Sequence, residues 1–332
     1  MNAPLRELLK QTSRSFYLTL RVLPASVRPQ IGLAYLLART TDTIADTEIM
    51  PPEQRLSALA ELRARILGRR TTPLNFTELA RHQGAPAERV LLEQCEASLA
   101  ALNSLAPGDV EHIRRVLDVI TGGQELDLQR FAHASGQRIV ALSSEAELDD
   151  YTYRVAGCVG EFWTRLCRTH VFPKARLEDA SLLADGIRFG KGLQLVNILR
   201  DLPGDLRKGR CYLPITALRT ADLKPEDLLD PANETKLRPI YDPLLAQAEA
   251  NLAAGWDYTN SLPWRCVRVR LACAWPILIG VQTLARLRVQ NPLDATRPIK
   301  ITRALVRGIL WRSVLLYPFP GLWRGQAAWP RT

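Results

Sequence analysis

Residues 191–214, KGLQLVNILRDLPGDLRKGRCYLP, form the stretch that best indicates the fold and the chemistry of this chain. Asn197, Asp201 and Asp205 recur every fourth residue, and residues four apart lie on one face of a helix. The remaining positions are mostly apolar or basic. Mg²⁺ is usually bound through one or two carboxylates, with waters and phosphates completing its shell. The stretch therefore predicts a helix that carries a magnesium site, followed by basic residues suited to phosphates.

Pro203 and Gly204 interrupt this stripe of oxygen ligands. A proline inside a helix lacks the N–H that bonds the carbonyl four residues back, and it disfavours helical conformation in the residue before it. We therefore expect the regular helix to end at about Leu202. Asp205 would then lie on a kink or a loop and reach a metal through water or after loop closure.

A second acidic pair stands in residues 38–48, ARTTDTIADTE, where Asp42 and Asp46 are again four apart at the end of an apolar helix. One such pair is typical of a solvated helix face. Two pairs, each close to arginines, are more specific. If the two helices face each other across a cavity, their carboxylates would hold two or three Mg²⁺ ions against one diphosphate, and the metals would act as Lewis acids.

The composition excludes several classes of protein. The net charge of +10 suits nucleic acid, an anionic membrane or a polyanionic substrate, but no nucleic-acid-binding motif accompanies it, so no nucleic acid partner is expected. The six cysteines lack CxxC spacing, which argues against a disulfide framework and a zinc site. Neither a secretory signal nor an uncharged apolar run of spanning length is visible, so we expect a cytoplasmic protein without a spanning helix.

Almost the whole chain has the apolar periodicity of helices, and no alternating strand of useful length occurs. We predict one all-α domain over residues 1–332, with helices around a central apolar cavity; a bundle with a filled core is the alternative. The helices are expected at residues 5–20, 29–44, 53–68, 87–103, 109–132, 145–171, 178–202, 234–260, 263–289 and about 299–316. Residues 214–233 are expected to form a loop with short turns.

Several motifs, in order along the chain, resemble the squalene/phytoene synthase family. They are Ser13–Tyr17 (SRSFY), Ala38–Arg39 before Asp42–Thr43, Tyr151–Gly160 (YTYRVAGCVG), Gln194–Asp201 (QLVNILRD) and Gly209–Arg210. The resemblance implies an all-α isoprenoid synthase fold. It also implies head-to-head coupling of two prenyl diphosphates through a cyclopropyl intermediate.

The resemblance and the chemistry together imply roles for named residues. The metal ligands would be Asp42, Asp46, Asn197, Asp201 and Asp205. Substrate would be bound by Arg14, Ser15, Phe16, Arg39, Val155, Ala156, Gly160, Gln194, Asn197, Arg200 and Arg210. Tyr151 would join the four aspartates as a catalytic residue that relays a proton. Arginine forks match phosphate oxygens, aromatic faces stabilise a carbocation, and the glycine at 160 permits close approach of either a helix or a prenyl chain.

Within the family the closer likeness is to squalene synthases. Asp42–Asp46 (DTIAD) has the form common there. Leu271–Pro276 (LACAWP), Thr283–Ala285 and Ile299–Arg303 (IKITR) resemble the segments associated with the NADPH-dependent step. This implies Mg²⁺ and NADPH as cofactors, the latter at Lys300, Arg303, Cys273 and Pro276. It implies farnesyl diphosphate as the substrate, presqualene diphosphate as the intermediate and squalene as the product. The alternatives are a non-reductive synthase making phytoene, dehydrosqualene or presqualene diphosphate, and a catalytically silent assembly factor.

The C-terminal tail, about residues 308–332, is apolar and aromatic but too short to span a membrane, and Pro318 and Pro320 break its pattern. No acidic residue follows Asp294, whereas seven basic residues do. Two interpretations stay open: the tail rests on the anionic inner face of a membrane, or it folds over the core. A monomer is favoured, with the oligomeric state left open.

Overall fold

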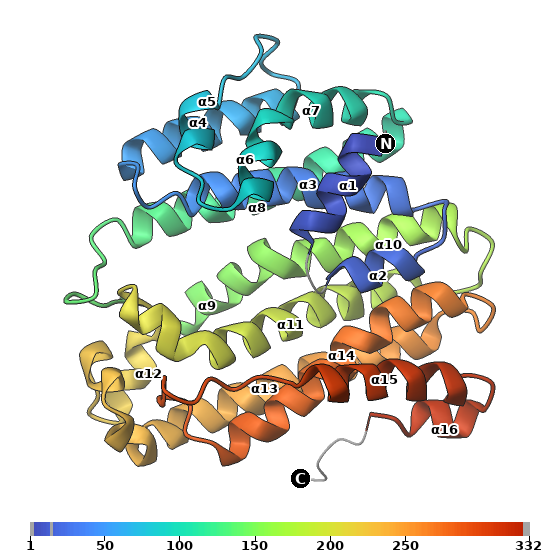
Figure 1. Cartoon of the computed structure of the whole chain (residues 1–332). Helices are drawn as coiled ribbons and strands as arrows, with labels where there is room; N and C mark the ends of the chain where they lie inside the picture. The colour runs from blue at the N-terminus through green and yellow to red at the C-terminus, as the bar shows by residue number, and fades with distance from the viewer. Residues whose placement is uncertain (1–2, 14–15, 328–332) are drawn as a thin grey trace. The chain divides into compact units, whose positions relative to one another are not determined.

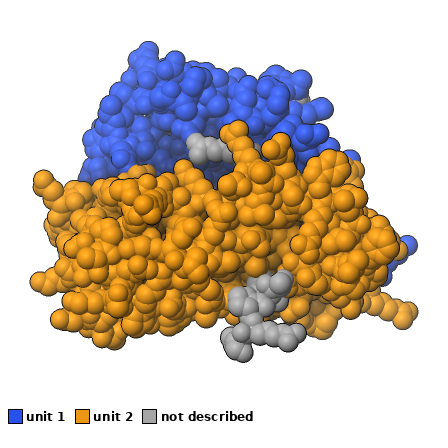
Figure 2. All heavy atoms as spheres, turned by 60° about the horizontal axis from the view of Figure 1, so that its bottom comes forward, with its two compact units in different colours: residues 1–132, 162–174 blue, residues 133–161, 175–332 orange. Residues whose placement is uncertain are grey.

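The computed structural model describes residues 3–13 and 16–327, and nearly all of their regular structure is helical (Figure 1). The described chain divides into two compact units, coloured separately in Figure 2. The first unit comprises residues 1–132 and 162–174, and the second comprises residues 133–161 and 175–332. The all-α prediction is thus confirmed for the described residues.

The first unit holds eight helices and the end of a ninth. They are α1 (Ala3–Thr12), α2 (Phe16–Val22), α3 (Arg28–Ala45), α4 (Pro52–Ile66), α5 (Thr77–Arg81), α6 (Pro86–Glu93), α7 (Cys95–Asn103), α8 (Pro107–Arg130) and all but the first turn of α10 (Cys158–His170). Helices α3, α4, α6 and α8 have proline in their first turn, where its missing N–H would have no helical partner anyway.

Helix α3 packs against α4, α7 and α8 in the core of this unit. Its buried face carries Leu33, Leu36, Leu37 and Ile44, each at most 2% exposed. These residues recur at the spacing of three and four that predicts the helix. The burial of this face fixes which way the opposite, polar side of α3 points, and Asp42 stands on that side.

The second unit contains the remaining elements. They are β1 (Val140–Leu142), α9 (Glu145–Thr152), the π-helix η1 (Tyr153–Gly157), the first turn of α10, α11 (Asp179–Arg207), β2 (Arg210–Pro214), α12 (Ile215–Thr220), the 3₁₀ helices η2 (Pro225–Leu229) and η3 (Pro231–Asn233), α13 (Glu234–Ser261), α14 (Val267–Val289), α15 (Arg303–Leu316) and α16 (Pro320–Arg324). Strands β1 and β2 pair in parallel and form the one described sheet.

Helix α11 is the element against which the second unit packs, because α13, α14 and the π-helix all contact it. Glycines allow the closest of these approaches. A Cβ on Gly190 would lie 2.1 Å from the carbonyl oxygen of Ala156, and a Cβ on Gly160 would lie 1.9 Å from that of Gly186. Of the two interpretations of Gly160, close packing of a helix is therefore observed; a contact with substrate stays a prediction.

Three expected boundaries were wrong. The expected helix 5–20 is two helices, because α1 ends at Thr12 and α2 begins at Phe16. The expected helix 87–103 is two helices, α6 and α7, separated at Gln94. The break was missed because a single non-helical residue hardly disturbs the apolar periodicity. Within the expected loop, the structure has α12 and two 3₁₀ helices.

By length and hydropathy alone, α14 is the one described helix that could cross a membrane, which differs from the expectation of none. However, 61% of its most apolar window is buried inside the structure. A helix that is apolar all round is expected in the core of a protein of this size. We therefore interpret α14 as a core helix.

Candidate active site

The first acidic pair belongs to the first unit, at the carboxyl end of α3. Asp42 stands in the last turn, and Asp46 directly follows the helix. The Asp46 N–H donates to the Asp42 carbonyl over 2.8 Å, so the two residues are one turn apart, as their spacing predicts. Asp46 is exposed, and 46% of the Asp42 side chain is open to solvent. Both carboxylates are therefore accessible to a ligand.

Arg39, one turn before Asp42, is held between two carboxylates. Its Nη1 lies 3.8 Å from Asp42 Oδ2, and its Nη2 donates to Glu88 on α6. Gln124, in the middle of α8, donates from its amide to Asp42 Oδ1. Sequence reasoning singled out Arg39 but missed Glu88, because nothing local in α6 indicates a partner 49 residues away.

These neighbours change the acidity of Asp42. Partial burial raises the pKa of Asp42 to about 6, and the nearby Asp46 carboxylate adds to the rise. Arg39 and the hydrogen bond from Gln124 act in the opposite direction. Below about pH 6 the carboxyl group is mostly protonated and is a poor metal ligand, so binding of a cation in that range would release a proton.

The second set of oxygen ligands belongs to the second unit, along α11. Contrary to the expectation from Pro203, α11 runs unbroken to Arg207, and Asp205 is helical. Asn197, Asp201 and Asp205 thus lie four residues apart on one helix. Asn197 and Asp201 are exposed and Asp205 is half-buried. The expected helix end at about Leu202 and the loop at Asp205 were wrong, whereas a kink at Pro203 stays a prediction.

Another residue supplies a hydrogen bond in place of the one that Pro203 lacks. In a regular helix the N–H of residue 203 would bond to the carbonyl of Leu199. In this structure the Tyr241 hydroxyl on α13 donates to that carbonyl over 2.8 Å. Helix interiors tolerate proline poorly when the freed carbonyl is left without a partner. The local rule for proline was therefore overridden by a contact 42 residues away.

The arginines predicted for phosphate binding in this unit lie close to the stripe along the chain. Arg200 forms two hydrogen bonds to its neighbour Asp201, of 2.8 and 2.5 Å, and these bonds raise the pKa of Arg200. Arg210 is the first residue of β2 and follows Gly209, whose φ is +77°. A Cβ at Gly209 would meet Ser135 backbone atoms at 2.4 Å. The glycine therefore allows the tight turn that joins α11 to β2.

The predicted aromatic and small residues lie around the π-helix. Tyr151, in the last turn of α9, stacks on Tyr212 of β2 with ring centroids 4.6 Å apart. Val155 and Ala156 are half-buried within the π-helix. Single π turns inside α-helices are frequent at functional sites. Sequence reasoning missed both the π turn and Tyr212, although Tyr212 stands in the same stretch, residues 191–214, as the candidate metal ligands of α11.

The other predicted residues are placed as follows. Gln194 lies on α11, half-buried, one turn before Asn197. Arg14 and Ser15 lie outside the described residues, and so does the side chain of Phe16. Lys300 and Arg303 are exposed before and at the start of α15, and Pro276 is half-buried in α14. Cys273 is 1% exposed, so a cofactor could not reach it without displacing core side chains.

The donor sets fit a cation that keeps much of its own hydration. Within the described ranges, no three His, Cys, Asp or Glu side chains form a ready metal cluster. Pairs of accessible carboxylates with open surroundings suit Mg²⁺, which retains waters and shares phosphate oxygens. Gln124 Oε1 is buried and accepts no hydrogen bond from the described residues. A metal-bound water at Asp42 would supply the missing donor.

Comparison with known proteins assigns this chain to a family. The profile of the squalene/phytoene synthase family matches residues 9–304. The chain belongs to that family. It is 29% identical over 305 residues to the presqualene diphosphate synthase of Rhodopseudomonas palustris, covering 91% of this chain and 93% of the relative. It is also 27% identical over 281 residues to the squalene synthase ERG9 of Saccharomyces cerevisiae, covering 84% of this chain and 60% of the yeast protein.

Solved structures show the same fold. The ligand complex of TcSQS superposes with a TM-score of 0.78 at 21% identity, over 97% of this chain and 91% of that one. As a member of this family, the chain is a prenyltransferase with the all-α isoprenoid synthase fold, and prenyl diphosphates are the family's class of substrate. The family prediction from the motifs is confirmed.

Proposed function

We propose that this synthase couples two farnesyl diphosphates head to head into presqualene diphosphate and reduces that intermediate to squalene with NADPH. The observation that best supports the proposal is the pair of accessible acidic sets, each with carboxylates one helical turn apart and an arginine in contact with one of them. Such sets fit a Mg²⁺–diphosphate group. The presence of both acidic sets counts against a catalytically silent assembly factor.

The acidic sets would bind the charged ends of the substrates. Mg²⁺ held by Asp42 and Asp46 in the first unit, and Mg²⁺ held by Asn197, Asp201 and Asp205 in the second, would each neutralise diphosphate charge. Arg200 would exchange Asp201 for diphosphate oxygens at small cost, because exposed ion pairs are worth only about 0–1 kcal/mol. Arg39 would add hydrogen bonds to a diphosphate held in the first unit, and Arg210 to one held in the second.

Loss of diphosphate leaves an allylic cation at C1 of one substrate. The C2–C3 double bond of the second substrate attacks this carbon, and loss of one proton closes the cyclopropane ring, so charge and atoms balance. The stacked Tyr151–Tyr212 pair would offer π-faces that stabilise the cation, and the Tyr151 hydroxyl would relay the proton lost in ring closure to the released diphosphate. Val155 and Ala156 would exclude water, which would otherwise quench the cation as an alcohol.

Reduction of the intermediate is tested by the product itself. The purified chain is incubated with farnesyl diphosphate and Mg²⁺, with and without NADPH, and the lipids are analysed. We expect presqualene diphosphate without NADPH and squalene with it. Dehydrosqualene or a hydroxylated product as the sole output under both conditions would contradict the reductive step, and no product at all would favour a silent assembly factor.

A second candidate is a synthase that stops at presqualene diphosphate. It is supported by the relative from Rhodopseudomonas palustris, which carries that name, and by the burial of Cys273. The proposed NADPH site then rests on Lys300, Arg303 and Pro276. Presqualene diphosphate as the only product, even with NADPH in excess, would favour this candidate.

We also propose that the C-terminal helices contact an anionic membrane. The outer surface of α15, α16 and their connection exposes five large apolar residues: Trp311, Val314, Leu315, Phe319 and Leu322. The inner side is folded onto the core, with Trp323 and Tyr317 buried. The tail thus folds over the core while its outer surface stays apolar. Exposed arginines accompany it, namely Arg303, Arg307, Arg312 and Arg324, and both features suit a lipid surface with negative charge.

Substitution of Phe319, 57% exposed, by glutamate should weaken binding to vesicles that contain anionic lipid by about tenfold, since burial of a phenylalanine contributes about 1.5–3 kcal/mol. Ile49→Glu is the matched control, because Ile49 is 72% exposed in the first unit, away from this surface along the chain. Flotation with anionic and with neutral vesicles measures the effect. Equal loss for both variants, or no binding by the parent, would contradict the membrane proposal.

A further inference from the structure

Pro203 creates a specific problem in the part of α11 that carries the carboxylates, because it stands between Asp201 and Asp205. Its ring provides no N–H for the Leu199 carbonyl. Leu199 is fully buried, so water cannot satisfy that oxygen. A buried carbonyl without a donor costs about 1–3 kcal/mol, which would favour opening of the helix at this point. Opening would separate Asp205 from Asn197 and Asp201.

Tyr241, on the neighbouring helix α13, supplies the donor that the Leu199 carbonyl lacks. Its ring and hydroxyl are fully buried, and the hydroxyl donates to Leu199 over 2.8 Å. Burial raises the pKa of Tyr241, so the group stays a neutral donor at any physiological pH. Phenylalanine at this position would fill the same space without the donor.

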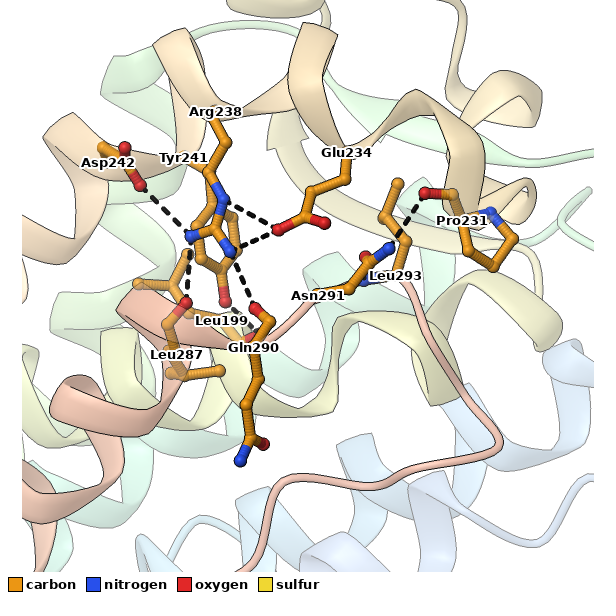
Figure 3. A network of polar contacts seen from close by, with 10 residues as sticks. All are labelled: Leu199, Pro231, Glu234, Arg238, Tyr241, Asp242, Leu287, Gln290, Asn291 and Leu293. Atoms are coloured by element: carbon orange, nitrogen blue, oxygen red, sulfur yellow. Dashed lines mark hydrogen bonds and ion pairs between the residues drawn. The ribbon is translucent and has the colours of Figure 1, made fainter.

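Tyr241 is itself held by a network around Arg238 (Figure 3). The Arg238 guanidinium lies 5.8 Å from the centre of the Tyr241 ring. It also donates to Glu234 and to the backbone carbonyls of Leu287 and Gln290, over 2.9 and 2.7 Å for the two carbonyls. These bonds tie α13 to the end of α14. Arg238, which lies against the Tyr241 ring, is therefore fixed by bonds to the end of α14, and this helps to hold the tyrosine hydroxyl toward α11.

We infer that Tyr241 is a positioning residue for the Mg²⁺–diphosphate site on α11, because its hydroxyl replaces the hydrogen bond that Pro203 removes between Asp201 and Asp205. The inference rests on the proposed function for its ligand. Tyr241 would act through α11 and would not itself contact the substrate. Its distinguishing consequence is that the need for the tyrosine hydroxyl exists only while residue 203 is proline.

The test is a double-mutant cycle on the full chain. Calorimetric titration of Mg²⁺ in the presence of inorganic pyrophosphate measures binding without turnover. Tyr241→Phe should raise the Mg²⁺ concentration for half-saturation about tenfold, at the low end of the loss seen for outer partners of metal ligands. Tyr241→Phe combined with Pro203→Ala restores a backbone N–H for Leu199 and should return this concentration to within about twofold of the parent. Pro203→Ala alone completes the cycle.

The matched control is Tyr317→Phe, which removes another tyrosine hydroxyl that donates to a backbone carbonyl, that of Trp264 over 2.5 Å. It should leave Mg²⁺ binding unchanged. Unchanged binding in Tyr241→Phe, or a double variant as weak as Tyr241→Phe, would overturn the inference. If Tyr241→Phe fails to fold, a folded double variant with parental Mg²⁺ binding supports the inference and an unfolded one overturns it. Mg²⁺–pyrophosphate binding in a chain that couples no prenyl diphosphate would count against the proposed function alone.

Discussion

Asp201→Ala should lower the rate of prenyl coupling by at least about 100-fold. Substitution of residues that only hydrogen-bond to a metal ligand already lowers metal affinity or activity about 10- to 100-fold, and Asp201 is a proposed ligand itself. The side chain of Asp201 is half exposed and bonded to Arg200, so its removal leaves no buried group without a partner. The helical fold should therefore stay intact. Product formation from farnesyl diphosphate at saturating Mg²⁺ measures the loss, and circular dichroism verifies the fold.

A second carboxylate of the same helix provides the control. Asp185 also lies on α11, half-buried, sixteen positions before Asp201 and outside the predicted ligand set. Asp185→Ala should keep activity within about twofold, because substitutions away from such features usually change little. Turnover by Asp201→Ala at the parental rate would refute the assignment of the stripe on α11 as a metal site, whatever the product.

The metal-ligand candidates were predictable because their arrangement is local. Spacing by four places Asp42 with Asp46, and Asn197 with Asp201, whatever the rest of the fold does, and the structure keeps both spacings within helices or at a helix end. The rule for Pro203 is equally local, and it failed at Asp205. The Tyr241 hydroxyl arrives from a helix that begins 31 residues after Pro203 along the chain, and neither α13 nor α11 contains a pattern that pairs these two residues.

The surroundings of the sites could not be predicted for the same reason. Glu88 and Gln124 reach Arg39 and Asp42 from α6 and α8 only because the apolar faces of those helices pack in the first unit as they do. The π turn at Tyr153–Gly157 spans five residues, which are too few for an apolar period to indicate it. The glycines were the one signal in the sequence, since they indicated close approach without naming the partner.

The largest effect on stability is expected where the C-terminal tail meets the core. Trp323 is fully buried, stacks on Trp256 at 5.5 Å, and meets Tyr317 edge-on at 4.8 Å. Its indole N–H donates to Asn260 Oδ1 over 2.9 Å. The buried Arg270 guanidinium lies 5.5 Å from its ring. Burial lowers the pKa of Arg270, and the aromatic faces around it offset part of the cost of a charge there.

Trp323→Ala should therefore reduce the free energy of unfolding by about 3–5 kcal/mol, the range for deletion of a buried large aromatic side chain. Denaturant unfolding followed by circular dichroism measures the loss. Trp311→Ala is the control of equal chemistry, because Trp311 is 69% exposed on the neighbouring helix α15 and should change stability by less than about 0.5 kcal/mol.

The two tryptophans also separate the two roles of the tail. Trp323→Ala removes the frame on which α16 rests, so it should weaken vesicle binding as well as stability. Trp311→Ala removes only a lipid-facing side chain, so it should weaken vesicle binding at unchanged stability. Equal stability losses for the two variants would mean that the tail does not pack on the core through Trp323, and the exposed apolar surface would then lack the rigid support that the membrane proposal requires.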